Sequence, residues 1–363
     1  MQLAGRRLLL GIAISVGLLL TAACGGSNSG SGDPAVTEET PSLFPVTIVV
    51  GGSPVTSRAS TPNAVTPDRT PAPSATAEGA IGTPSASIDC TPARPHAPGD
   101  TNGAITSGGL DRTYILHIPP AYDGVDPMPV IFNLHGFGSN AQQQANYSGF
   151  PAKADAEGFI VVSPNGTGSP QMWSFPFLGT VDEPAFIADL LDRLEAELCI
   201  DAKRVYAAGM SNGAAISTFI ACALPDRIAA IAEVAATAGP RACATKSPIP
   251  IITFRGTDDI CVPYDGGTSQ CGLNLPVIGA EEVIRLWAVH NTCNETPATT
   301  RFAADVLVTA YSECSRFTAA LLYTVEGGGH TWPGAVDAPR LGLTTHSINA
   351  TDLIWEFFQG HTN

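Results

Sequence analysis

Positive charge is scarce in this sequence of 363 residues. It has 18 Lys and Arg residues against 33 Asp and Glu residues, and its formal net charge is −15. A protein that binds nucleic acid needs a basic face to pair with phosphates. The composition therefore argues against a nucleic-acid partner and predicts an acidic, soluble surface.

The spacings typical of zinc sites are absent as well. The sequence has no C-x-x-C pair and no H-E-x-x-H motif, so we expect no metal centre. Eight cysteines remain besides Cys24, and an even number in an exported chain favours disulfides. Proximity along the chain suggests the pairs Cys261 with Cys271, Cys293 with Cys314, and Cys222 with Cys243, which leaves Cys90 for Cys199. The sequence alone does not fix this connectivity.

The apolar run in the first segment is shorter than the roughly 20 residues of a membrane-spanning helix. Two arginines precede that run and small residues follow it, which is the layout of an export signal. The segment ends in LTAAC, which resembles a bacterial lipobox. We therefore expect residues 1–24 to be a lipoprotein-type signal peptide, with Cys24 as the lipid attachment site. Thr21 departs from the leucine most common in that motif, and plain secretion is the alternative.

Residues 25–89 contain little apolar sequence. Ser, Thr, Pro, Gly and Ala dominate them, and such a composition cannot offset the entropy lost on ordering the chain. We expect a disordered tether here, although LFPVTIVV at residues 43–50 does not fit that description. The remaining residues, 90–363, are long enough for one large domain.

Strand-like and helix-like patterns alternate through residues 90–363, as a parallel sheet with crossover helices requires. The strand-like runs are RTYILHI (112–118), PVIFNLHG (129–136), GFIVVSPN (158–165), RVYAAG (204–209), RIAAIAEVAA (227–236), PIPIITFRG (248–256) and AALLYTVEG (319–327). Helical patterns cover 182–198, with Asp182 as N-cap, and 212–224, 280–290 and 350–360. We therefore predict an α/β fold with functional residues at the carboxyl ends of the strands.

The pentapeptide GMSNG at 209–213 lies between a predicted strand and a predicted helix. A G-x-S-x-G motif in this context places its serine on a tight strand-to-helix turn, where the hydroxyl is exposed at the sheet edge. Ser211 is thus the candidate nucleophile. A serine that merely caps the helix is the structural alternative.

A serine nucleophile requires a base and an acid that orients the base, and in this fold they follow the serine in the order acid, then histidine. Of the later histidines, only His330 directly follows a strand, on the loop VEGGGHTWPG. Its glycines allow the loop to fold back over the sheet edge. For the acid, Asp258 and Asp259 both follow a strand, and physical reasoning does not separate them.

Acyl transfer also needs hydrogen-bond donors where the oxyanion develops. We expect the backbone amide of Asn212 to be one donor and that of Phe137, after the IFNLHG strand, to be the other. His135 sits where the oxyanion loop is built, and we expect it to be structural. Trp332 and Trp173 follow strands near this site, and we expect their rings to contact substrate, with core packing as the alternative.

The motifs LHGFG, DAKRVYAAGMSNGAA, GTDDICVPYDGG and EGGGHTWPG occur in this order. Together they resemble the secreted polyhydroxybutyrate depolymerase and feruloyl esterase family of α/β hydrolases over most of residues 110–360. The resemblance implies an α/β-hydrolase fold with a mostly parallel central sheet, helices on both faces and a single catalytic domain. It also implies Ser211 as nucleophile, His330 as base and Asp259 as acid, because the family's acid stands three residues after Gly256. Arg255 replaces a histidine common before that glycine, and VDEPAF at 181–186 departs from paired aspartates often found there.

These observations predict an exported serine ester hydrolase that uses no cofactor. The expected partner is an ester substrate: a hydroxycinnamoyl or acetyl ester of plant polysaccharide, or a hydroxyalkanoate oligomer. The expected location is the cell surface through the lipid anchor, or the medium if the protein is simply secreted. A serine peptidase and a surface binding protein without catalysis are the alternatives.

Overall fold

The computed structural model describes residues 90–363, apart from residues 180 and 245. The expected signal at 1–24 with Cys24, and the tether at 25–89, lie outside the described residues. The described residues all fall within one compact unit. None of their helices is both long enough and apolar enough to cross a membrane.

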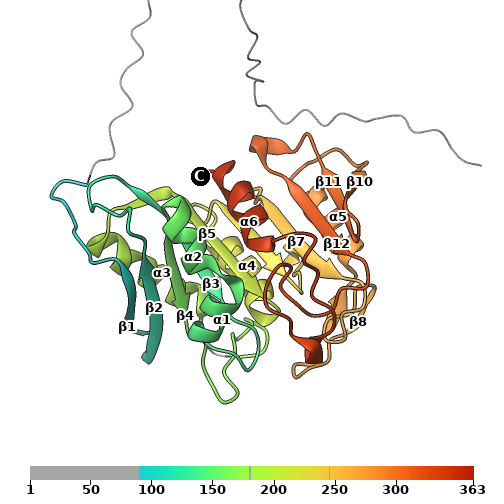
Figure 1. Ribbon diagram of the computed structural model, residues 1–363, viewed down its shortest axis with the longest axis horizontal. Helices are drawn as coiled ribbons and strands as arrows, with labels where there is room; N and C mark the ends of the chain where they lie inside the picture. The colour runs from blue at the N-terminus through green and yellow to red at the C-terminus, as the bar shows by residue number, and fades with distance from the viewer. Residues whose placement is uncertain (1–89, 180, 245) are drawn as a thin grey trace, which may run out of the picture. The chain divides into compact units, whose positions relative to one another are not determined.

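One large sheet organises the domain (Figure 1). Its ten strands follow the order β1-β2-β4-β3-β5-β6-β7-β12-β11-β10, and β8 and β9 form a separate two-stranded sheet. The strands are β1 (Gly99–Ser107), β2 (Leu110–Ile118), β3 (Met128–Leu134), β4 (Ile160–Pro164), β5 (Ile200–Met210), β6 (Ala230–Val234), β7 (Ile251–Gly256), β8 (Gly266–Thr268), β9 (Pro276–Ile278), β10 (Ala298–Ala303), β11 (Val306–Tyr311) and β12 (Ala320–Val325).

The centre of the large sheet, from β4 to β12 in that order, is parallel. Antiparallel pairings extend it to β2 and β1 at one edge and to β11 and β10 at the other. Because the central strands are parallel, their carboxyl ends meet along one edge of the sheet. The loops that carry the predicted functional residues leave the sheet at that edge, as expected.

Helices cover both faces of the sheet (Figure 1). The helices are α1 (Ala141–Ser148), α2 (Phe150–Glu157), α3 (Glu183–Glu197), α4 (Asn212–Ala223), α5 (Ala280–His290) and α6 (Ala350–Gln359), with short 3-10 turns η1 (Pro240–Ala242), η2 (Ser315–Phe317) and η3 (Pro339–Leu341). The buried side chains of α3, α4 and α5 form one apolar core with the sheet. Those of α2 and α6 form a second core on the other face.

The apolar periodicity predicted the long helix after β4 well. Asp182 caps α3, and its side chain accepts a hydrogen bond from the Ala185 amide. The predicted apolar face of α3 is fully buried, which explains why the pattern was readable. The expected mostly parallel sheet with helices on both faces is likewise confirmed.

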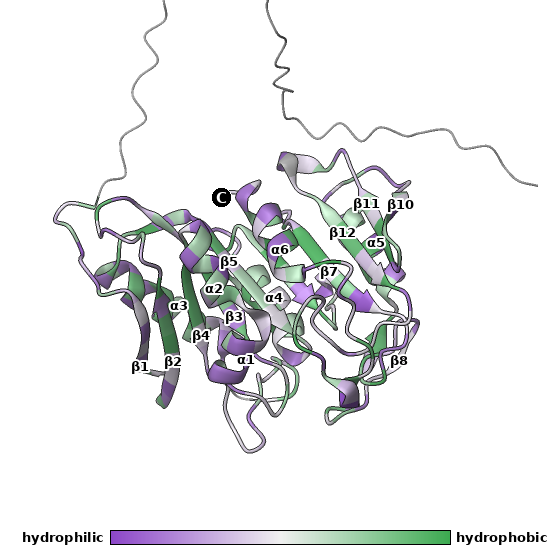
Figure 2. Ribbon diagram, viewed as in Figure 1, coloured by the Kyte–Doolittle hydropathy of each residue, from purple (hydrophilic) through white to green (hydrophobic). Residues whose placement is uncertain are grey.

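Several elements were not predicted from the sequence. The antiparallel strands β1, β10 and β11 lie near the sheet edges and bury few of their residues. Helix α1 has the sequence AQQQANYS, and Figure 2 shows it as mostly hydrophilic, in contrast to the hydrophobic β2, β4 and β7. Elements with so little apolar alternation carry no strong periodic signal.

All four expected disulfides are present. They join Cys90 to Cys199, Cys222 to Cys243, Cys261 to Cys271, and Cys293 to Cys314. Four disulfides indicate a protein that matures in an oxidising compartment outside the cytoplasm.

Candidate active site

Ser211 occupies the turn between β5 and α4. Its backbone has φ 56° and ψ −117°, outside the regions that a residue with a side chain ordinarily adopts. A side chain on the neighbouring Gly213 would collide with the carbonyl oxygen of Leu134, so the turn needs glycine there. A strained non-glycine residue held by its surroundings is typical of a functional position, and this geometry is that of a nucleophile elbow.

His330 and Asp259 form a buried hydrogen-bonded pair. The Nδ1 atom of His330 lies 2.8 Å from Oδ2 and 3.0 Å from Oδ1 of Asp259, and both side chains are nearly inaccessible to solvent. A carboxylate can only accept, so Nδ1 donates and Nε2 is left as the proton acceptor. Ser211 makes no hydrogen bond to His330 within residues 90–363, a contact that commonly tightens only when substrate binds.

The structure separates the two aspartates that the residues alone left open. Asp259 Oδ1 accepts hydrogen bonds of 2.8 Å from the amides of both Cys261 and Val262, which fix the carboxylate toward His330. Asp258 is exposed, and its backbone amide donates to the Gly328 carbonyl. The family resemblance and the geometry therefore agree on Asp259 as the partner of His330.

The loop that carries His330 needs its glycines because backbone approaches backbone. The amides of Gly329 and His330 donate to the carbonyls of Leu343 and Leu341, and a side chain on Gly329 would collide with this second segment. Gly327 has φ 72°, in the left-handed region. The glycines thus let the loop turn back after β12 and bring His330 beside Asp259, as predicted.

The other histidines after Ser211 are occupied elsewhere. His290 ends α5 and contacts the Ser247 carbonyl, His346 pairs with Asp337 on the surface, and His361 contacts the Phe357 carbonyl near the C-terminus. The elimination that selected His330 from the sequence agrees with these positions.

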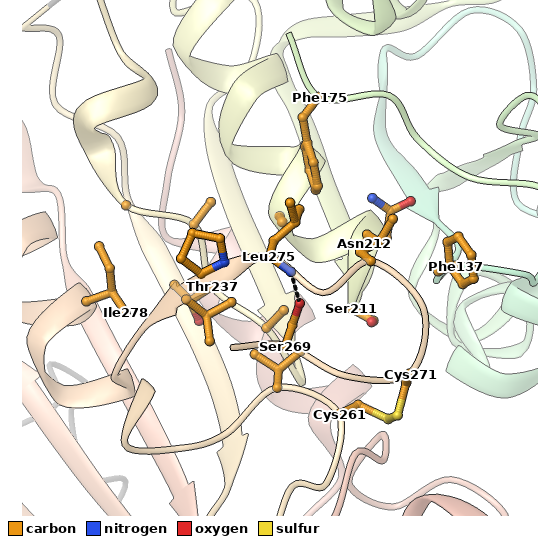
Figure 3. Close-up of a pocket in the computed structure, with 18 of the residues that line it drawn as sticks. Phe137, Phe175, Ser211, Asn212, Thr237, Cys261, Ser269, Cys271, Leu275 and Ile278 are labelled. Atoms are coloured by element: carbon orange, nitrogen blue, oxygen red, sulfur yellow. Dashed lines mark hydrogen bonds between the residues drawn. A yellow bond between two sulfur atoms is a disulfide. The ribbon is translucent and has the colours of Figure 1, made fainter. Parts of the chain in front are cut away.

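Phe137 and Asn212 border the same cavity as Ser211 (Figure 3). Asn212 begins α4, so its amide has no partner within the helix. The Phe137 amide makes no hydrogen bond within the described part of the chain. Both backbone amides are therefore free to donate a hydrogen bond to a group bound in the cavity. Their assignment as oxyanion donors stays a prediction.

His135 is structural, as expected. Its ring is fully buried, and Nε2 accepts a 2.9 Å hydrogen bond from the Gly166 amide. The pKa of His135 is lowered to about 4, mainly by burial; the hydrogen bond to the Gly136 carbonyl opposes this shift, and the positive charge of Arg112 adds to it. The imidazole is consequently neutral at pH 7, and it does not act as a base in the cavity because the ring is buried and Nε2 already accepts the hydrogen bond from Gly166.

The two tryptophans predicted to contact substrate require a correction. Trp173 is 0% exposed and Trp332 is 1% exposed, and neither lines the cavity. The Trp332 indole donates to Thr351 Oγ1 and packs edge-on against Phe150, whereas the Trp173 indole donates to the His135 carbonyl. Both rings hold loops in place, because an indole N–H in the interior must find an acceptor.

An apolar cavity of about 500 Å³ opens beside Ser211. Figure 3 shows Phe175 and Leu275 on its walls, and the Cys261–Cys271 disulfide lines the same cavity as Ser211. Its aromatic and aliphatic lining residues are Phe137, Phe175, Phe177, Phe219, Val262, Leu273, Leu275, Pro276, Val277 and Ile278. Such a cavity suits an acyl group with a large apolar body.

Sequence reasoning missed most of this lining. Phe175, Phe177 and Phe219 form one aromatic cluster, with ring centroids 5.4 to 6.1 Å apart. Phe219 lies on α4, two turns after Ser211, and that spacing was an available signal. The other wall comes from the loop around β8 and β9, which the Cys261–Cys271 disulfide holds beside the cavity. Its weak local pattern offered no signal.

The side chains of Asp259, Cys261 and His330 have ligand-type atoms within 4.8 Å of one another. The sulfur of Cys261 is bonded to Cys271 and cannot supply a thiolate. The remaining two side chains already pair with each other. This cluster therefore fits the proton chemistry of a hydrolase better than metal ligation.

Comparison with known proteins agrees with this geometry. Residues 112–258 match the family model described as Esterase PHB depolymerase. Feruloyl esterase B of Piromyces equi is 31% identical over 229 residues, which are 60% of this chain and 42% of that protein. Feruloyl esterase C of Emericella nidulans is 28% identical over 268 residues, which are 71% of this chain and 87% of that protein. The chain thus spans less than half the length of the first relative.

A solved acetyl xylan esterase from Aspergillus awamori has the same fold, with a TM-score of 0.53 at 15% identity over 72% of this chain and 99% of that one. Together with the esterase relatives, this likeness defines the class as ester hydrolases of the α/β-hydrolase fold. Within that class, residues 112–258 match the Esterase PHB depolymerase family model and the relatives are feruloyl esterases, the two groups that the sequence motifs resemble.

Proposed function

We propose that this protein is a serine carboxylic ester hydrolase that works through an acyl-enzyme. The observation that carries the proposal is the buried His330–Asp259 pair at the sheet edge where the elbow presents Ser211. Asp259 holds Nδ1–H, so Nε2 is oriented to accept the serine proton. The helix-capping role for Ser211 finds no support, since its side chain makes no cap hydrogen bond to α4.

The proposed reaction proceeds in two halves. Ser211 Oγ attacks the ester carbonyl while its proton passes to His330 Nε2, and the amides of Phe137 and Asn212 bind the resulting oxyanion. The C–O bond then breaks, and His330 returns the proton to the leaving alcohol. A water molecule repeats these steps on the acyl-enzyme, releases the acid and regenerates Ser211. No metal or organic cofactor takes part in these steps.

The size and the aromatic lining of the cavity favour an ester with an aromatic acyl group over one with a small acyl group. A phenyl ring packs well against the Phe175, Phe177 and Phe219 cluster, and offset or edge-on aromatic pairs add to the apolar burial. An acetyl group would leave most of the 500 Å³ empty. Relatives named feruloyl esterases point the same way. We therefore propose hydroxycinnamoyl esters as the preferred substrates, ahead of acetyl esters and hydroxyalkanoate oligomers.

The proposed site of action is outside the cytoplasm, at the cell surface. The disulfides support an exported protein, and the lipobox-like LTAAC supports acylation of Cys24. Residues 25–89 would then tether the domain to the membrane. Labelled palmitate should enter the wild-type protein and not Cys24→Ala. Release of unlabelled wild-type protein into the medium would instead indicate plain secretion.

A fluorophosphonate probe tests the nucleophile, and a substrate panel tests the acyl group. The probe should label the wild-type domain and not Ser211→Ala. Among methyl ferulate, p-nitrophenyl acetate, hydroxybutyrate oligomers and peptide anilides, methyl ferulate should have the highest kcat/KM.

Each alternative has its own outcome in this experiment. A folded wild-type protein that fails to react with the probe would favour a surface binding protein without catalysis. Labelling combined with hydrolysis of anilides alone would favour a peptidase. Preference for the oligomers would leave the mechanism intact and replace the proposed acyl group.

A further inference from the structure

Trp173 connects the two segments that carry the proposed oxyanion donors. It lies on the loop after β4, between the loop after β3, which holds Phe137, and the start of α4, which holds Asn212. Its side chain is 0% exposed and outside the cavity lining. The residue therefore contacts the proposed catalytic machinery from behind and not the substrate.

The first connection runs from Trp173 to Asn212. The Asn212 Oδ1 atom accepts a 2.7 Å hydrogen bond from the Trp173 backbone amide, and its Nδ2 donates to the Trp173 carbonyl at 3.1 Å. Both polar atoms of the side chain are thus used, in the buried interior. The backbone amide of the same asparagine is one proposed oxyanion donor, so Trp173 fixes the residue that carries it.

The second connection runs from Trp173 to the loop after β3. The indole Nε1 donates to the His135 carbonyl at 2.8 Å, two residues before Phe137. The His135 ring in turn accepts a hydrogen bond from Gly166, at the start of the same loop. The Gly138 amide donates 2.8 Å to the carbonyl of Gln171. Phe137 is therefore flanked on both sides by hydrogen bonds to the loop of Trp173.

A buried ion pair holds both ends of this loop. The Arg112 guanidinium donates to Glu183 at 2.8 Å and to the Asn165 carbonyl at 3.1 Å. The other oxygen of Glu183 accepts a hydrogen bond from the Ser174 amide. Asn165 and Ser174 lie at either end of the segment that contains Trp173, so the segment is fixed to β2 and α3 and can act as a rigid support.

We propose that Trp173 is a positioning residue that holds the amides of Phe137 and Asn212 at the separation the oxyanion requires. The proposal rests on the proposed function. Oxyanion donors stabilise the transition state only when they are aimed at the charge before it forms. Loosening either connection should therefore lower kcat and leave ground-state binding of the ester unchanged.

The test compares the kcat and KM of two variants in which phenylalanine replaces a tryptophan and so removes its indole N–H. Trp173→Phe removes the N–H bond to His135 and keeps the backbone bonds to Asn212, and it should lower kcat about tenfold with KM changed less than twofold. The matched control is Trp355→Phe, on α6, whose indole donates to Glu157 away from the cavity; its kcat should equal that of the wild type. Asn212→Ala removes the other connection and keeps its own backbone amide.

Two further measurements separate positioning from loss of folding. Affinity for an aryl boronic acid, which forms a tetrahedral adduct with the serine, should weaken in parallel with kcat/KM, whereas affinity for ferulic acid should stay constant. Both changes loosen contacts of the loop that carries Trp173. The fold decrease in kcat/KM of the double variant Trp173→Phe/Asn212→Ala should therefore be smaller than the product of the two single decreases.

Defined outcomes would overturn the proposal. Folded variants with wild-type kcat and wild-type boronate affinity would exclude the positioning role. Equal losses of boronate and ferulic acid affinity would assign Trp173 to pocket shape instead. A wild-type protein without hydrolysis or probe labelling would overturn the proposed function itself, and the positioning role with it.

Discussion

His330 pairs with Asp259 and not with Asp258, its neighbour in sequence. Two backbone amides hold the Asp259 carboxylate toward the imidazole, whereas Asp258 faces solvent. Replacing Asp259 by Asn retains the shape and favours the wrong imidazole tautomer, so kcat for methyl ferulate should fall by on the order of a thousandfold or more.

Asp258→Asn is the matched control and should retain kcat within about twofold, because surface changes of this kind are usually small. Steady-state kinetics on both purified variants decide the matter. Loss of activity in Asp258→Asn with normal turnover in Asp259→Asn would transfer the acid role to Asp258.

The aromatic cluster in the cavity provides a prediction on substrate preference. Phe219→Ala removes a ring that contacts both Phe175 and Phe177, and kcat/KM for methyl ferulate should fall about tenfold, as expected for one lost aromatic contact and its apolar burial. For p-nitrophenyl acetate, kcat/KM should change less than twofold.

Phe302→Ala is the control for this change, because Phe302 is 53% exposed on β10 and packs against Tyr323. Its kinetics should match the wild type with both esters. Equal losses of Phe219→Ala on the two esters would mean that the ring supports the fold and does not select the acyl group.

His135 makes the domain sensitive to mild acid. Its pKa is lowered to about 4 in the folded protein, mainly by burial, against 6.5 for an unperturbed histidine. Between pH 6.5 and pH 4, His135 is therefore protonated in the unfolded chain and neutral in the folded protein. The free energy of unfolding should therefore fall as the pH drops from 6.5 to 4, by on the order of 3 kcal/mol from this group.

Urea titrations at pH 7 and pH 4.5 measure this effect, with His135→Gln as the reference because it lacks the titrating ring. The wild type should lose more stability than this variant on acidification. Parallel losses in the two proteins would show that His135 contributes nothing to the acid sensitivity.

Glu233 produces a pH dependence of opposite sign. It is fully buried on β6, its carboxyl accepts a hydrogen bond from Thr218 Oγ1, and burial raises its pKa to about 8. The folded protein then keeps a proton that the unfolded chain releases above about pH 4.5. The stability from this group should be complete below pH 4.5 and decline as the pH rises toward 8.

Glu233→Gln keeps the shape without the titration. The difference in unfolding free energy between the variant and the wild type should increase in favour of the variant from pH 5 to pH 8. A difference that stays constant over that range would mean that Glu233 is ionised throughout, paired electrostatically with the buried Arg255.

Local patterns predicted the elements that bury an apolar face and the residues whose role follows from their place on the chain. The helix α3, the elbow at Ser211 and the loop of His330 were all predicted in this way, because each has a strong local signal: an apolar stripe, a glycine-flanked serine between strand and helix, or a glycine run after a strand. The polar α1 and the edge strands lack such signals, and they were missed for that reason.

The sequence by itself determined the alternation of the central strands and the long helices, the even cysteine count and the candidates for nucleophile and base, since these depend on spacing and periodicity. Only the tertiary structure showed that Asp259 and not Asp258 contacts His330. It also showed that the cavity walls come from α4 and two distant loops, and that Trp173 lies behind the oxyanion loop and not in the cavity lining. The physical reason is the same in each case. The direction of a side chain, and whether its hydrogen bonds are made to solvent, substrate or another loop, depends on contacts between segments far apart in the chain, which no local pattern encodes.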